Sequence, residues 1–198
     1  MWGFGDWFPP KEGWASFREQ LDRLTEHDVT PEGVVNTRKL YNVSDVWKNR
    51  PDEARPWAIR NQDQTLASHT QQNIKTYHPH LTADCWYNEY VTALETWVEE
   101  GAKQLWIDGI PWQGQEACFA DDHSHPPGKG GNWWATDLKA KLRDLRENRL
   151  DGDDSILISG EGISEFFLPE MKVHMPRDVL HEVYGQFHPE RETIPLTQ

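Results

Sequence analysis

Two acidic side chains stand where apolar segments end. Asp108 follows the run Gln104–Ile107 in QLWIDGI, and Glu161 lies between two glycines after the β-branched run of SILISGEG. Both runs are predicted strands, and the helical pattern between them predicts that they pair in parallel. The carboxyl ends of parallel strands lie at one edge of a sheet, so we expect Asp108 and Glu161 to share a rim.

Two carboxyl groups on one rim are what the hydrolysis of a glycosidic bond requires. One carboxylate attacks or stabilises the oxocarbenium-like centre, and one carboxylic acid protonates the leaving oxygen. We expect Asp108 in the first role, because a strand terminus holds it rigidly, and Glu161, with its longer side chain, as the acid. In the alternative interpretation, Asp108 only caps the turn that follows it and Glu161 is solvated.

Further polar and aromatic side chains are candidates for sugar contacts. Asn36 and Arg38 end another predicted strand, where they could hydrogen-bond sugar hydroxyl groups, and tryptophan faces could stack on pyranose rings. Trp134 opens an amphipathic helix and is assigned to the core. Asp6, in the glycine-bent segment WGFGDWF, is alternatively a turn residue. The predicted substrate contacts are Asp6, Asn36, Arg38, Trp112, His123, His125 and Trp133.

The segment CFADDHSHPPG combines residue types that bind metals. Cys118, His123 and His125 could hold zinc, with Asp121 or Asp122 as a further ligand. The simpler interpretation is a rigid His-x-His-Pro-Pro-Gly loop that presents imidazoles to sugar hydroxyls, and on this interpretation we expect no metal and no cofactor. A metal-dependent hydrolase that uses His123 and His125 is the alternative from a different functional class.

Apolar periodicity predicts several elements around these residues. Helices are expected over about 14–27, over 86–98 with a stop at Gly101, and from a cap at Asn132 with Trp134, Leu138, Leu142 and Leu145 inward. Strands are expected over about 29–35, 104–107 and 155–159, and from Glu182 onward. The polar stretch 38–84 is expected to be a long loop over the rim.

This order of elements predicts a single α/β domain over residues 1–198 with a parallel sheet. We expect part of a (β/α)8 TIM-type barrel with about four or five strands, because a complete barrel usually needs about 250 residues. The remaining strands would come from elsewhere, or the chain would be truncated, with sheet edges that invite oligomerisation. A smaller open α/β sheet is the structural alternative.

Composition restricts the possible partners. The net charge is −13, from 33 acidic against 20 basic residues, which argues against nucleic acid or an anionic membrane and leaves neutral sugars unaffected. The acidic excess fits either a halophilic surface or an ordinary acidic protein. No signal-peptide pattern or membrane-length apolar run is present, so a cytoplasmic protein is expected if the chain is complete. The two cysteines form no CxxC pair and are expected to be reduced thiols.

Several segments are similar in sequence to those of a known protein family. They are WxxG near the start, the segment ending in VVNTRK, the unit ending in LWIDGI, the run CFADDHSHPPGKGGNWW and ILISGEGISEFF. Together they resemble an uncharacterised family of glycoside-hydrolase-like (β/α)8 barrels, and HxHPPGxGGxWW is the most specific part. The resemblance implies a glycosidase-like fold that acts on or binds carbohydrate. Ile110, Ser124 and Lys129 depart from the family pattern; these departures concern activity rather than fold.

The acid pair itself resembles that of α-amylase-type barrels. In those enzymes the nucleophilic aspartate ends one strand and the acid glutamate ends the next, which implies the same roles for Asp108 and Glu161. A non-catalytic remnant that keeps a sugar-binding rim is the alternative function.

Overall fold

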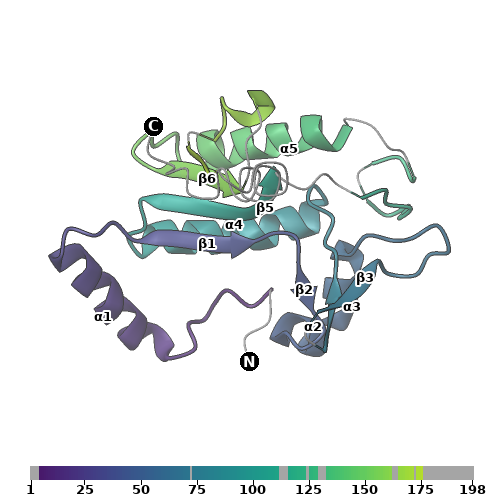
Figure 1. Ribbon diagram of the computed structural model, residues 1–198, viewed down its shortest axis with the longest axis horizontal. Coiled ribbons are helices and arrows are strands. Elements are labelled where there is room, and N and C mark those ends of the chain that lie inside the picture. Colours follow the sequence, from purple (N-terminus) through teal and green to yellow (C-terminus); the bar gives the residue numbers. More distant parts are fainter. Residues whose placement is uncertain are drawn as a thin grey trace, which may run out of the picture.

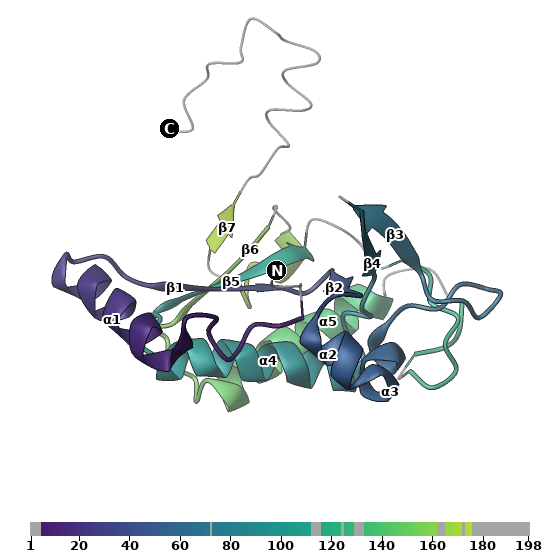
Figure 2. The ribbon, with the colours of Figure 1, turned by 90° about the horizontal axis from the view of Figure 1, so that it is seen from below.

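The computed structural model describes residues 5–71, 73–111, 116–123, 125–128, 133–161, 165–171 and 173–175. Its centre is a parallel sheet in the order β1-β5-β6-β7 (Figure 1 and Figure 2). The strands are β1 (Glu32–Asn36), β5 (Gln104–Pro111), β6 (Leu157–Glu161) and the three-residue β7 (Val173–Met175). The α/β class and the parallel pairing of β5 with β6 agree with the sequence analysis.

Three main helices accompany the sheet. They are α1 (Gly13–Glu26), α4 (Asp84–Glu99) and α5 (Trp133–Asp144), and α5 continues into the π-helical η2 (Leu145–Arg149). Their bounds agree with the predicted helices to within a few residues, although the predicted cap Asn132 lies outside the described residues. Figure 2 shows α4 and α5 together on one side of the sheet.

The main core lies between the sheet and these two helices. Leu105 and Ile107 of β5 are fully buried, because alternate residues of a strand point to the same face. On α5 and η2, the predicted inner face is confirmed by the burial of Leu138, Leu142 and Leu145. Gly33 of β1 allows a close approach to α4: a Cβ atom there would lie 2.4 Å from the Trp97 ring.

Residues 38–84, expected to be a long loop, contain secondary structure of their own. A three-stranded antiparallel sheet has the order β2-β4-β3. The elements are β2 (Leu40–Tyr41), α2 (Asp45–Asn49), α3 (Pro51–Ala54), the 3-10 helix η1 (Arg55–Trp57), β3 (Ser68–Gln71) and β4 (Ile74–Tyr77). Strands as short and polar as SHTQ and IKTY carry no apolar period, which explains the different expectation.

A bulge interrupts the pairing of β5 with β6 at their carboxyl ends. Ile107 pairs with Gly160, yet the next pair joins Pro111 to Glu161. Three residues of β5, Asp108 to Ile110, therefore have no paired residue on β6. Gly160 accommodates them, since a Cβ atom there would lie 2.3 Å from the Ile110 carbonyl oxygen.

Several expectations concern residues outside the described ranges. The strand expected from Glu182 lies outside the described residues, whereas the short η3 (Glu165–Phe167) and β7 had not been foreseen. Association through sheet edges stays a prediction. In the described part of the chain, no helix has the length and apolar character needed to cross a bilayer.

Candidate functional site

Asp108 lies in the carboxyl-terminal half of β5, opposite the last residue of the neighbouring strand β1. Asn36 pairs with it in the sheet register, and its side-chain amide Nδ2 donates a hydrogen bond to Asp108 Oδ2. The Asn36 Oδ1 atom accepts from the Arg38 backbone N–H at 3.0 Å. Because both ends of the amide are engaged, Asn36 fixes the orientation of the Asp108 carboxylate. Asn36 is buried, whereas Asp108 is half-buried and reachable from solvent.

Glu161 lies at the carboxyl end of β6, on the other side of β5. Its Oε2 atom accepts a hydrogen bond from the Gly109 backbone N–H at 3.0 Å. Only 6% of Glu161 is exposed. Asp108 and Glu161 therefore lie on adjacent parallel strands at the same edge of the sheet. Asn36 of β1 holds the Asp108 carboxyl group, and Gly109 of the bulge holds the Glu161 carboxyl group. The separation of the two carboxyl carbons, expected to be within about 10 Å, stays a prediction.

Arg38 extends this edge of the sheet. Its side chain lies against Gly109, where a Cβ atom would come within 2.1 Å of Arg38 Cγ. Burial lowers the pKa of the guanidinium, and the attraction of Glu116 opposes this shift. Arg38 Nη1 is buried and, among the described residues, has no hydrogen-bond partner. A ligand oxygen is the kind of group that would satisfy such a donor.

A chain of ionisable side chains continues from Arg38. His78 Nδ1 lies 2.7 Å from Glu116 Oε1, and His78 Nε2 lies 2.6 Å from His69 Nδ1. The hydrogen bond from His78 lowers the pKa of Glu116, and the charge of Arg38 adds to this effect. The sequence analysis missed His69 and Glu116, which stand in unremarkable polar segments and meet only through tertiary structure.

The other predicted sugar contacts have different surroundings. The Asp6 carboxylate accepts hydrogen bonds from the backbone N–H groups of Asp45 and Val46 at the start of α2, and Asp6 lines a surface hollow beside α4. Trp112 lies outside the described residues. Trp133 begins α5, but its side chain is not among those described. Trp134 packs against the core near Phe167, as expected.

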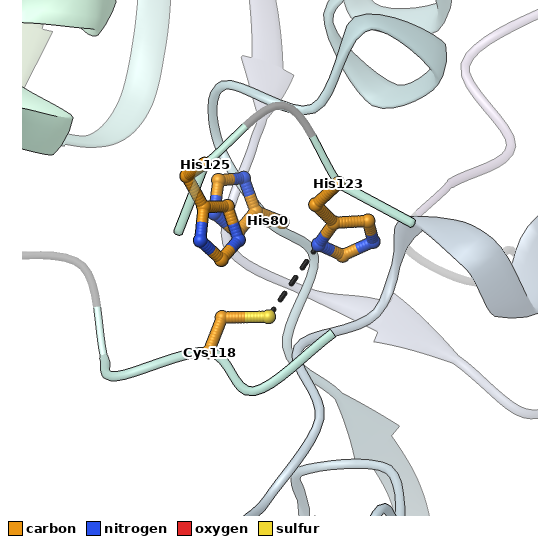
Figure 3. A group of neighbouring side chains, drawn as sticks. All are labelled: His80, Cys118, His123 and His125. Atoms are coloured by element: carbon orange, nitrogen blue, oxygen red, sulfur yellow. Dashed lines mark hydrogen bonds between the residues drawn. The ribbon is translucent and has the colours of Figure 1, made fainter. Parts of the chain in front are cut away.

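The two predicted loop histidines meet a cysteine and a third histidine (Figure 3). One ligand atom from each of His80, Cys118, His123 and His125 lies within 4.8 Å of the others. The His80 and His125 rings stack, with centroids 4.3 Å apart and planes 4° apart. His123 Nδ1 lies 3.4 Å from Cys118 Sγ. His80, Cys118 and His125 are buried, and His123 is half-buried.

Burial favours the uncharged forms of His80, His123 and Cys118. Burial, followed by the neighbouring His125 and His123 rings, lowers the pKa of His80 to about 2. Burial also lowers the pKa of His123 and raises the pKa of the Cys118 thiol. The imidazoles of His80 and His123 are therefore neutral at pH 7. The expected approach of His123 or His125 to Asp108 or Glu161 stays a prediction.

Comparison with protein families gives one match over almost the whole chain. The profile described as "Domain of unknown function (DUF6259)" matches residues 2–198. No curated protein matches the chain.

Several solved structures share the fold of this chain. An α-N-acetylgalactosaminidase from Bifidobacterium bifidum, in a Gal-NHAc-DNJ complex, superposes with a TM-score of 0.63 and 15% identity, over 86% of this chain and 25% of that one. An α-galactosidase from Thermus thermophilus in complex with stachyose gives 0.59 and 13%, over 87% and 33%. The GH36 α-galactosidase AgaB from Geobacillus stearothermophilus gives 0.61 and 10%, over 87% and 23%. The chain thus spans a third or less of the length of these glycosidases.

Proposed function

The chain belongs to the DUF6259 family, and from that premise we propose that it is a glycoside-hydrolase-like domain that acts on carbohydrate through Asp108 and Glu161. Its structural neighbours are glycosidases, which supports a carbohydrate ligand. The observation that carries the proposal is the position of the two acids at the carboxyl ends of adjacent parallel strands.

The strand order supports assigning this sheet to a partial (β/α)8 barrel. The strands lie side by side in the order in which they occur in the sequence, β1-β5-β6-β7. Helices α4 and α5 cover the same face of the sheet (Figure 2). A doubly wound sheet would reverse its strand order and carry helices on both faces. On the face opposite to α4, Val34 is 43% exposed and Trp106 is half-buried. An apolar face of this kind suits the interior wall of a barrel.

The surroundings of the two acids support a division of roles. Asp108 accepts the Asn36 amide N–H, which orients its carboxylate for the role of nucleophile or charge stabiliser. Glu161, buried and longer, suits the acid that protonates the leaving oxygen. Arg38, with a buried donor, and Asn36 would contact sugar hydroxyls or hold the acids in place.

The ligands of the structural neighbours suggest a substrate class for this chain. The Thermus thermophilus α-galactosidase was solved in complex with stachyose and with p-nitrophenyl α-D-galactopyranoside, and the Bifidobacterium enzyme is an α-N-acetylgalactosaminidase. We propose α-galactosides and their N-acetylamino counterparts as the first substrate class. These ligands carry no charge, which is compatible with a chain of net charge −13.

The proposal is tested by removing each carboxyl group without changing its shape. Asp108→Asn and Glu161→Gln are assayed with aryl α-galactosides and α-N-acetylgalactosaminides, beside the exposed controls Asp22→Asn and Glu99→Gln. Any turnover of the parent chain should fall at least about 100-fold in each rim variant. The controls should keep the parent kcat/KM. Turnover that survives both rim substitutions would exclude this acid pair as the catalytic centre.

A non-catalytic sugar-binding rim is the second candidate, and the buried donor of Arg38 is the observation that favours it. In that case calorimetry would detect binding of an α-galactoside without turnover. Asp108→Asn would keep this binding, since an amide still hydrogen-bonds hydroxyl groups. The metal-dependent hydrolase is less well supported, because His80, Cys118 and His125 are buried, whereas a catalytic metal needs a position open to substrate.

A further inference from the structure

The histidine–cysteine cluster has the composition of a transition-metal site, and its ligand atoms lie within 4.8 Å of one another. Cys118, His123 and His125 come from the loop between β5 and α5, and His80 from the loop before α4. Ligand atoms around a tetrahedral zinc lie roughly 3.3–3.8 Å apart, as follows from Zn–N and Zn–S bond lengths of about 2.1 and 2.3 Å. The distance of 3.4 Å between Cys118 Sγ and His123 Nδ1 falls in this range.

The outward-facing nitrogen of each loop histidine contacts a backbone carbonyl. His123 Nε2 donates to the carbonyl oxygen of Pro56, which leaves Nδ1 unprotonated toward Cys118. His125 Nδ1 donates to the Pro126 carbonyl oxygen at 3.1 Å, which leaves Nε2 unprotonated. Metal-binding histidines characteristically donate their other ring N–H to a carbonyl or carboxylate in this way, since the contact fixes tautomer and ring orientation.

The cysteine has the surroundings of a thiolate ligand. The Arg60 backbone N–H points at Cys118 Sγ at 3.5 Å and would stabilise negative charge on the sulfur. In its thiol form, Cys118 donates its S–H to His123 Nδ1. Metal binding would replace this S–H proton: the Zn–S bond forms, the S–H bond breaks and one proton passes to solvent, with no change of oxidation state.

We propose that Cys118, His123 and His125 bind one zinc ion. His80 is a positioning residue beside them. Its Nδ1 accepts the Ala83 backbone N–H at 3.0 Å, which puts the ring proton on Nε2, so His80 acts by stacking on His125 and holding that ring in place. The softness of a thiolate with two imidazoles selects zinc over magnesium or calcium.

The site would tie the β5–α5 loop to the insertion between β1 and α4. Backbone contacts already join the two segments: the Phe119 N–H donates to the Arg60 carbonyl at 2.9 Å, and Arg60 forms an ion pair with Asp122 at 3.1 Å. Zinc bound to Cys118 and His123 would hold this junction through His123 and Pro56. This role is structural and independent of glycoside hydrolysis.

Zinc uptake by the full chain tests the proposal. Protein stripped with a chelator is titrated with zinc against a chromogenic competitor, and the metal content is measured by mass spectrometry. The parent chain should bind one zinc and unfold at a higher temperature with it. Cys118→Ser and His125→Asn should lose this binding, whereas Cys85→Ser and His27→Asn, which change the other cysteine and an exposed histidine, should keep it. Failure of the stripped parent chain to take up zinc would overturn the proposal.

Cobalt substitution keeps the test informative if Cys118→Ser does not fold. In Cys85→Ser, Cys118 is the one cysteine left of two, so a thiolate-to-cobalt charge-transfer band in that variant would assign the ligand directly. Absence of the band in a folded Cys85→Ser protein would contradict the proposal. His80→Phe keeps a stacking ring and should bind zinc about 10–100-fold more weakly with unchanged stoichiometry. Complete loss of zinc there would overturn the three-ligand assignment.

Discussion

At the scale of single residues, Asn36 organises the edge of the sheet. Its side chain donates a hydrogen bond to Asp108 and accepts one from the Arg38 backbone. Asn36 thus links Asp108 and Arg38, and all three side chains can hydrogen-bond sugar hydroxyl groups. The Asp108 backbone carbonyl is held as well, by the N–H and hydroxyl of Thr37 at 3.2 and 3.1 Å. Asp108 is therefore constrained at both its backbone and its side chain, as a preorganised catalytic group should be.

Gly109 provides a residue-scale prediction. It has φ +90°, and a Cβ atom would meet the Arg38 side chain at 2.1 Å, whereas Gly101 has φ +100° with no atom within 4 Å. Gly101→Ala should cost about 1–2 kcal/mol of unfolding free energy from backbone strain alone. Gly109→Ala should cost more than this, because overpacking adds about 1–3 kcal/mol, and should weaken α-galactoside binding by displacing Arg38.

Chemical denaturation of both variants measures the difference, and calorimetry measures sugar binding. Equal destabilisation of the two variants would mean that Arg38 is not held against Gly109 in solution.

The candidate residues show what sequence can predict at this scale. The shared edge of Asp108 and Glu161 could be predicted because each follows an apolar run that forms a strand. The direction of that strand determines the edge of the sheet on which the acid lies. His80 could not be joined to Cys118 in advance, because 38 positions separate them and neither lies in a periodic segment. Nor did sequence indicate that Asp6 contacts the start of α2, since no pattern links it to Asp45.

At the scale of elements, Asp6 stabilises the short helix α2. Its carboxylate accepts two N–H groups at the helix start, and Ser44 Oγ accepts a third, from Trp47, at 3.2 Å. Asp6→Ala should therefore lower the unfolding free energy by about 0.5–2 kcal/mol, the range for loss of a helix N-cap. Thermal unfolding of Asp6→Ala beside the exposed Asp22→Ala measures this effect.

The same variants decide between two roles of Asp6. If it acts only on α2, sugar binding should stay at the parent level under conditions where both proteins are folded. A selective loss of sugar affinity in Asp6→Ala would instead favour the predicted substrate contact.

The elements that sequence predicted well are those with an apolar period. Helix α4 buries Trp86, Tyr90, Val91 and Leu94 on one stripe, and this 3.6-residue spacing is visible in the sequence. The β2-β4-β3 sheet could not be foreseen, because two of its strands are four residues long, one has two residues, and their pairing is tertiary. The three unpaired residues of β5 were hidden for the same reason, since register depends on the partner strand.

At the scale of the whole molecule, the described parallel sheet would form one side of the rim of the proposed barrel. Asp108 and Glu161 stand on two of its strands, and a barrel site normally draws side chains from several strand ends. We therefore expect weak or absent glycosidase turnover for this chain alone. Misplacement by about 1 Å can cost about 100-fold in rate, and an open, wet rim loses electrostatic preorganisation.

Assays of the isolated chain against aryl glycosides and oligosaccharides check this expectation. Robust turnover that Asp108→Asn or Glu161→Gln abolishes would show that the strands of this chain suffice for catalysis.

The three-residue bulge in β5 makes the spacing of the two acids adjustable by chain length. Upstream of the bulge, Ile107 and Gly160 keep the strands in register, so a residue inserted or deleted between Asp108 and Pro111 need not disturb the sheet. Such a change would alter how far the Gly109 amide reaches toward Glu161 and so how far apart the carboxyl groups stand. That separation distinguishes retaining from inverting glycosidases. If Asp108 and Glu161 are the catalytic pair proposed above, a one-residue length change in the bulge would alter the stereochemical outcome and leave both acids and the sheet in place.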